Sequence, residues 1–169
     1  MARKTWQEKF DDPRPHEVKP CPLDISGMKK GEVMLLPSPR IIDAFIRTIP
    51  SGVSMDARTL RTKLAKKYRA QVTCPITTGY HLRTVAEVAY AAHKAGDRDV
   101  TPVWRVLDDR SPTLKKLSFA AFIKRQRRAE GLLSHTRPRK RSAVRQRTLS
   151  ARVGSRGARC SSRSTTAPG

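Results

Sequence analysis

The stretch DARTLRTKLAKKYRAQVTCPITTGYHLRTVAEVAYAAHKAG, residues 56–96, holds two successive helical patterns. In the first, Asp56 is a good N-cap, and Leu60 and Leu64 follow at the spacing of one helix face. We expect this helix to end near Tyr68. Its remaining positions place five cations on the outer face: Arg58, Arg61, Lys63, Lys66 and Lys67.

The second pattern predicts a helix that Thr77 or Thr78 caps and Gly96 ends. Its inner face consists of Leu82, Val85, Val88, Ala89 and Ala92. The segment 70–76 between the two helices is expected to be irregular or a short strand. Two helices in this order are the layout of a helix-turn-helix, although the connection is longer than the three- or four-residue turn of the standard motif.

The flanking segments add three elements. Ser38-Pro39 predicts a helix start, followed at helical spacing by Ile41, Ile42, Phe45, Ile46 and Ile49. Residues 100–107 are β-branched and aromatic, which predicts a strand or extended loop. A last, very basic helix is expected over 119–130. The predicted fold class is mainly α, a winged-helix or helix-turn-helix type of DNA-binding domain with a short strand or wing.

The composition divides the chain into three parts. Prolines interrupt residues 1–30, which predicts an extended N-terminal arm with little structure beyond one short turn near Thr5 to Phe10. Residues 31–133 carry the periodic pattern of the domain. Residues 134–169 contain ten basic and no acidic side chains, so we expect a disordered tail that binds phosphates, although a sequence without a selected role is the alternative.

The formal net charge of +22 indicates a polyanionic partner. Three scattered cysteines, Cys21, Cys74 and Cys160, and a charged start favour a reducing compartment. We therefore expect a cytoplasmic, nucleoid-associated monomer that binds double-stranded DNA, with no membrane association, cofactor or metal.

The predicted DNA contacts lie on two helices. The start of the second helix of 56–96 would be the recognition helix, although an ordinary three-helix core explains the same residues. The last helix would contact the phosphates. The candidate residues are Thr77, Thr78, Gly79, Tyr80, Arg83, Lys124, Arg125, Arg127 and Arg128.

Four motifs in order resemble one known family. They are IPSGV (49–53), CPITTG (74–79), VTPVWRVL (100–107) and QRRAEG (126–131). Together they resemble the C-terminal DNA-binding domain of O6-alkylguanine-DNA alkyltransferases (methylated-DNA–protein-cysteine methyltransferases). The resemblance covers about residues 31–133, together with the start MARKTWQEK, and does not cover the tail.

The departures from the family pattern bear on chemistry. Val103 occupies the position of the family's alkyl-acceptor cysteine, and Trp104 that of the activating histidine. Because valine offers no thiolate, alkyl transfer at this position is excluded. The resemblance then implies an alkyltransferase-like protein, without enzymatic activity, that recognises alkylated DNA and hands it to a repair partner.

The resemblance also assigns roles to single residues. Arg83 best matches the arginine that fills the gap left by a flipped nucleotide. Arg105 matches a family arginine, and we expect it and Trp104 to contact DNA as well. Ala57 replaces the tyrosine that helps rotate the phosphate, which puts base flipping in doubt. Trp104 is interpreted as a core anchor or as a stacking face for DNA.

Two other functions remain open on the sequence. One is a non-specific nucleic-acid-binding protein of the nucleoid or RNA-associated type. The other is an unconventional methyltransferase that uses Cys74, which lies near a helix N-terminus where a thiolate is favoured. A half-buried structural role is the ordinary interpretation of Cys74.

Overall fold

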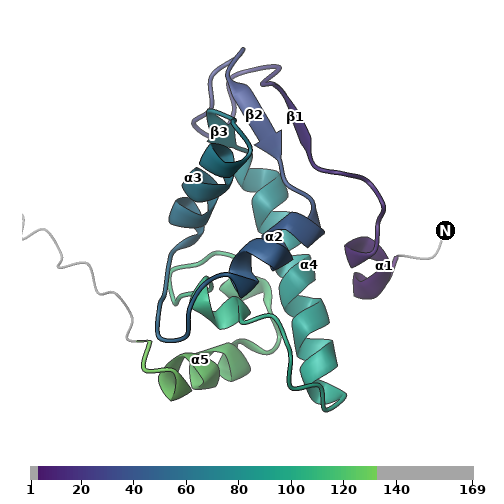
Figure 1. Cartoon of the computed structure of the whole chain (residues 1–169), viewed down its shortest axis with the longest axis vertical. Coiled ribbons are helices and arrows are strands. Elements are labelled where there is room, and N and C mark those ends of the chain that lie inside the picture. The colour runs from purple at the N-terminus through teal and green to yellow at the C-terminus, as the bar shows by residue number, and fades with distance from the viewer. Residues whose placement is uncertain (1–3, 133–169) are drawn as a thin grey trace, which may run out of the picture. The chain divides into compact units, whose positions relative to one another are not determined.

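Residues 4–132 are the part of the chain that the computed structural model describes. They form a mainly helical unit with one small sheet (Figure 1). The predicted tail, 134–169, lies outside the described residues. The elements in chain order are α1 (Trp6–Phe10), β1 (Glu17–Pro20), β2 (Val33–Leu36), α2 (Pro39–Arg47), α3 (Ala57–Lys67), β3 (Val72–Thr73), α4 (Pro75–Lys94), the 3-10 turns η1 (Val103–Arg105) and η2 (Leu114–Lys116), and α5 (Ala120–Ala129).

The N-terminal arm has more structure than the prolines led us to expect. It contains α1 and then β1, which pairs with β2 in antiparallel register, Val18 opposite Leu35. On its other side β2 pairs in parallel with β3, Leu35 opposite Thr73. The prolines are compatible with this because β1 is an edge strand and Pro20 is its last residue.

The helix starts follow the N-cap signals, with one shift. α2 begins at Pro39 after Ser38, as predicted, and Asp56 caps α3 by accepting a hydrogen bond from the Thr59 N–H at 2.7 Å. α4 begins at Pro75, before the predicted Thr77, with Cys74 at the N-cap position. A proline at the first helical position explains the earlier start, because that position needs no N–H donor.

The segment expected as a strand or extended loop, residues 100–107, forms no strand, and its centre, Val103–Arg105, is a 3-10 turn. η1 is closed by hydrogen bonds from the Arg105 N–H to the Pro102 oxygen, 3.0 Å, and from the Val106 N–H to the Val103 oxygen, 3.1 Å. Its apolar side chains are buried in the core, so their β-branched character does not serve a sheet. After α4, the described residues up to 132 form no strand, and hence no wing of paired strands.

Two groups of buried side chains hold the unit together. The larger lies between α2, α3, α4, α5 and η1, with Ile42, Leu64 and Ile123 fully buried. The smaller lies against the sheet and is rich in sulfur: Cys21, Met28, Met34 and Cys74. Cys21, expected in an unstructured arm, is therefore a core residue. Among the described helices, none combines the length and apolar character needed to cross a membrane.

Candidate nucleic-acid interface

The outer side of α3 is strongly basic. Residues 57–69 contain six cations and no acidic residue. We call the side chains Arg58, Arg61, Lys63, Lys66, Lys67 and Arg69 the α3 basic face. Most of them are exposed, while Leu60, Leu64 and Ala65 on the opposite side are buried. None of the six forms an ion pair with another residue within 4–132. Their charge is therefore available to an external anion.

Arg69 holds an unusual backbone position just beyond α3. Its φ is +53°, in the left-handed region that favours glycine. The Ala70 N–H bonds to the Ala65 oxygen at 2.9 Å and the Arg69 N–H to the Lys66 oxygen at 3.4 Å, which is the Schellman arrangement that commonly ends helices at glycine. An arginine here extends the α3 basic face at the expense of local backbone strain.

The predicted recognition residues at the start of α4 have unequal exposure. Thr78 is buried, and its hydroxyl donates to the Cys74 carbonyl at 2.7 Å. Thr77 and Gly79 are half-buried, and Tyr80 is 49 % exposed. Only Tyr80 among these four presents a large surface to solvent.

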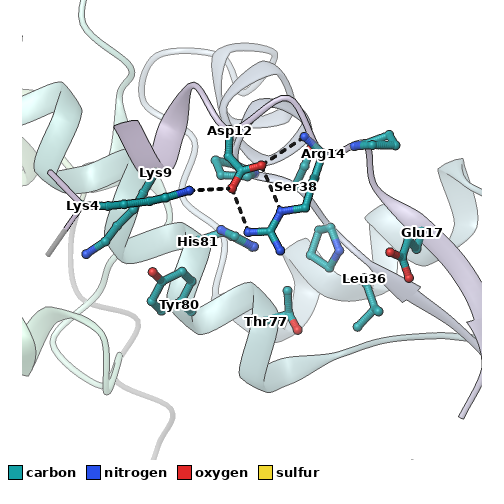
Figure 2. A pocket seen from close by; sticks show the side chains of 13 residues that line it. Lys4, Lys9, Asp12, Arg14, Glu17, Leu36, Ser38, Thr77, Tyr80 and His81 are labelled. Atoms are coloured by element: carbon teal, nitrogen blue, oxygen red, sulfur yellow. Dashed lines mark hydrogen bonds and ion pairs between the residues drawn. The ribbon is translucent and has the colours of Figure 1, made fainter. Parts of the chain in front are cut away.

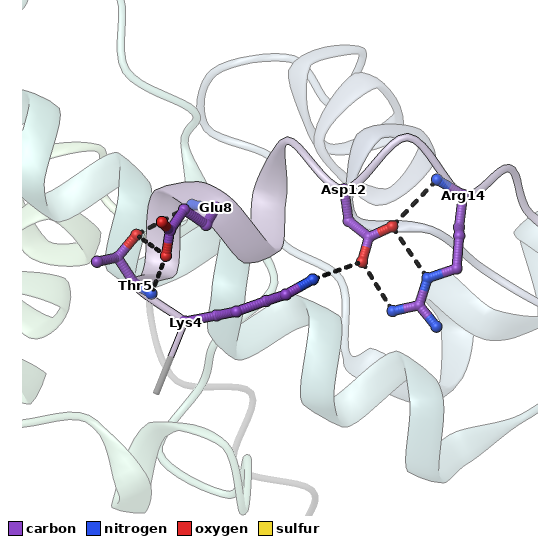
Figure 3. Close-up of polar contacts among 5 residues, drawn as sticks. All are labelled: Lys4, Thr5, Glu8, Asp12 and Arg14. Carbon is purple, nitrogen blue, oxygen red and sulfur yellow. Dashed lines mark hydrogen bonds and ion pairs between the residues drawn. The ribbon is translucent and has the colours of Figure 1, made fainter. Parts of the chain in front are cut away.

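Arg83 is partly covered by the N-terminal arm, and 36 % of its side chain stays exposed. Its guanidinium lies over the Trp6 ring, 5.0 Å from the ring centre, and its Nε is 3.5 Å from a Glu87 carboxylate oxygen. α1, the short purple helix of Figure 1, lies beside α4 along this side. Figure 3 shows what holds α1 in shape: Thr5 and Glu8 bond reciprocally in a capping box. Filling a DNA gap with Arg83 would require α1 to move.

The residues of η1 are built into the core. Val103 is fully buried, and Trp104 is 8 % exposed, packed edge-on against Phe122. Arg105 donates two hydrogen bonds to Glu130, at 2.8 and 2.9 Å, and a third to the Ile49 carbonyl. Burial acts to raise the pKa of Glu130, but the hydrogen bonds and charge of Arg105, together with hydrogen bonds from Trp104 and Gly52, lower it below its ordinary value. Trp104 and Arg105 thus have structural roles rather than surfaces for DNA.

The cations of α5 divide into two kinds. Arg127 is 5 % exposed; its guanidinium donates to the Trp104 and Leu107 carbonyls and to the Ser54 hydroxyl. The other three predicted contacts are exposed. Lys124 pairs with Asp109 at 3.3 Å, Arg125 lies over Phe122 at 5.9 Å, and Arg128 has no ion pair within the described residues. Arg127 is thus closed to phosphate in this arrangement.

Cys74, the nucleophile of the unconventional alternative, is buried at 7 % exposure. Its sulfur accepts a hydrogen bond from the Thr77 hydroxyl at 3.4 Å. Its environment is the sulfur-rich cluster under the sheet. A large alkylated base has no open path to this sulfur without movement of α4 or β3.

Comparison with known proteins adds no family: no family model matches the chain, and no curated protein or solved structure matches it. The interface therefore rests on the chain's own residues. The α3 basic face was visible in the sequence as outward cations but was not among the predicted DNA contacts. The signal that identifies it is the absence of any acidic residue in ARTLRTKLAKKYR (57–69).

Proposed function

We propose that this protein binds double-stranded DNA through phosphate contacts made by the α3 basic face. The observation that carries the proposal is the group of cations on and just after α3 that have no counter-ion among the described residues. Lysine and arginine held this way bind phosphates with release of condensed counter-ions, and the affinity does not depend on base sequence.

The length of α3 also suits phosphate binding. An eleven-residue helix is about 16 Å long, which lets its cations reach several phosphates along a groove about 12 Å wide. Lys66, Lys67 and Arg69 lie at the carboxyl end, where positive charge also stabilises the helix dipole. The positive charge at this end of the basic face is therefore compatible with the dipole of α3.

The test is a fluorescence-anisotropy titration of a 20-base-pair duplex at several salt concentrations. The triple variant R58Q/K63Q/K66Q is expected to bind at least tenfold more weakly and to lower the slope of log K against log salt by roughly two to three. The matched control is K29Q/K30Q/K94Q, which removes the same charge from exposed positions elsewhere. Equal loss in both variants would contradict the proposal, since bulk charge would then explain binding.

The alkyltransferase resemblance adds a finer proposal, that the bound DNA is recognised through its alkylated guanine. Its support is the resemblance of the four motifs alone, because Val103 and Trp104 are packed in the core. The same titration with and without O6-methylguanine tests it: at least fivefold tighter binding of the lesion duplex is expected. Equal affinity for the two duplexes would contradict lesion recognition and favour a non-specific nucleic-acid-binding protein. Intact mass after incubation with O6-benzylguanine tests transfer to Cys74, and an unchanged mass excludes it.

A further inference from the structure

A pocket of about 550 Å³ lies between the N-terminal arm and the start of α4. Figure 2 shows its lining side chains, with Tyr80 and His81 from α4 and Arg14 and Asp12 from the arm. Leu36 and three prolines supply apolar wall, and Ser38 marks the start of α2. We call this the arm pocket. Its size is typical of sites for small molecules, and it shares no residue with the α3 basic face.

Ser38 supplies the first polar group without a partner. It stands at the N-cap of α2 and is only 9 % exposed, yet its hydroxyl makes no capping hydrogen bond and none to another described residue. The first N–H groups of a helix have no partner within the helix. Pro39, the first helical residue, has no N–H, and Arg40 and Ile41 do not line the pocket, so the free donor here is the Ser38 hydroxyl itself. A buried hydroxyl without a partner can donate to an anion.

The charged side chains of the arm pocket leave a net positive balance. Its two carboxylates are already paired: Asp12 with Arg14 at 2.7 Å and with Lys4 at 3.7 Å, and Glu17 with Lys19 at 2.6 Å. Asp12 engages the Nε and one terminal nitrogen of Arg14, so the guanidinium keeps a second terminal nitrogen for another acceptor.

Tyr80 and His81 supply an aromatic wall of the arm pocket. The rings of Tyr80 and His81 meet edge to face with centres 5.1 Å apart. The Nδ1 atom of His81 is buried without a hydrogen-bond partner, and buried nitrogens of this kind are rare. Burial, together with the charge of Arg14, lowers the pKa of His81. A neutral imidazole beside an exposed phenol ring forms a surface for a planar, polar ring system.

We propose that the arm pocket binds a small anion carrying a planar ring, either an aromatic carboxylate or a mononucleotide. The anionic group lies between the Ser38 hydroxyl and the free terminal nitrogen of Arg14, and the ring lies against Tyr80 and His81. This site goes beyond the proposed DNA binding and uses other residues. A ligand there would also fix the arm to α4, because it contacts both.

Calorimetric titration with four probes tests the class of ligand. The probes are 4-hydroxybenzoate, 5′-AMP and their uncharged counterparts, 4-hydroxybenzyl alcohol and adenosine. At least one anion is expected to bind tenfold or more tightly than its uncharged counterpart, because hydrogen bonds to charged groups are the strong ones. The anion that binds more tightly shows whether the ligand is an aromatic carboxylate or a mononucleotide. Equal binding of each pair, or no binding by any probe, overturns the proposal.

Ser38→Ala locates the site. We expect it to weaken the preferred anion at least fivefold and to leave Tm unchanged, because the hydroxyl makes no capping bond. The matched control, Ser118→Ala, removes an exposed hydroxyl outside the pocket and should bind as the unaltered protein does. Arg14→Gln gives a second measure, with weakened anion binding and unchanged duplex affinity. Anion binding that both Ser38→Ala and Arg14→Gln leave intact would overturn the assignment.

Discussion

α3 and α5 are helices of similar length and similar basicity, yet they use their cations differently. α3 turns its cations to solvent and buries only apolar side chains. α5 buries Arg127 among backbone carbonyls and leaves Lys124, Arg125 and Arg128 outside. The number of cations on a helix therefore does not define an interface. The acceptors within reach of each cation decide whether it supports the fold or faces a partner.

The largest expected effect comes from Arg127. Arg127→Met should lower the free energy of unfolding by about 3 kcal/mol, since the Trp104 and Leu107 carbonyls lose a buried, charged donor. Urea denaturation followed by circular dichroism measures it. Arg128→Met, the exposed neighbour, should change stability by about 0.5 kcal/mol or less. Similar losses for both would break the distinction between the two kinds of cation in α5.

A smaller effect is expected at Glu130, the partner of Arg105. Glu130→Gln should cost about 1–2 kcal/mol at pH 7, because the carboxylate accepts two charged hydrogen bonds. Folding lowers the pKa of Glu130 below its ordinary 4.5, so the stabilisation is present above that pH and is lost as pH falls through the folded-state value.

The difference in unfolding free energy between the unaltered protein and Glu130→Gln should therefore shrink below about pH 4.5. Asp109→Asn is the matched control, because its ion pair with Lys124 is half exposed and contributes little. A difference that stays constant down to pH 2 would show that Glu130 acts by packing rather than by charge.

Replacing Arg69, just beyond α3, with glycine should raise stability and weaken DNA binding. Arg69→Gly should raise stability by about 1 kcal/mol by relieving the left-handed backbone. It should also weaken duplex binding about twofold and lower the salt slope by about 0.9. Arg69→Ala separates the two effects, since it removes the charge and keeps the strain. Unchanged DNA affinity in both variants would remove Arg69 from the interface.

The smallest effect is expected at Arg83. Arg83→Gln should leave duplex affinity within twofold, because Trp6 and Glu87 already hold the guanidinium. Anisotropy titration measures it, with R58Q/K63Q/K66Q as the positive reference. A tenfold loss would place the interface on α4 and make α1 a displaceable cover.

The sequence predicted the helices well where a local signal exists. Asp56 and Gly131 lie where the capping signals put them, the latter with φ of +67° just after α5. The start of α4 was misplaced because Pro75 was not weighed as a first helical residue. β1 was missed because its partner, β2, lies across a loop of the chain, and pairing at that distance leaves no local pattern.

The candidate site was harder to predict than the fold. Arg127 stands next to the exposed Arg128 in sequence, and only its acceptor, the Trp104 carbonyl, distinguishes it. Arg105 likewise is identified as structural only by its acceptor, Glu130. Those acceptors come from segments up to 25 residues away in sequence. The arm pocket had no signal at all, since it joins residues of the arm, α2 and α4 that no motif connects.

The short length of α1 determines how its backbone amides exchange with solvent. A helix of five residues with no buried residue is far too short to persist alone, so α1 stays ordered only while it rests on α4. Its amides should exchange through local opening at a free energy well below that of global unfolding. Each opening event exposes Arg83 and one wall of the arm pocket, so protection factors in residues 6–10 report how often both surfaces become accessible.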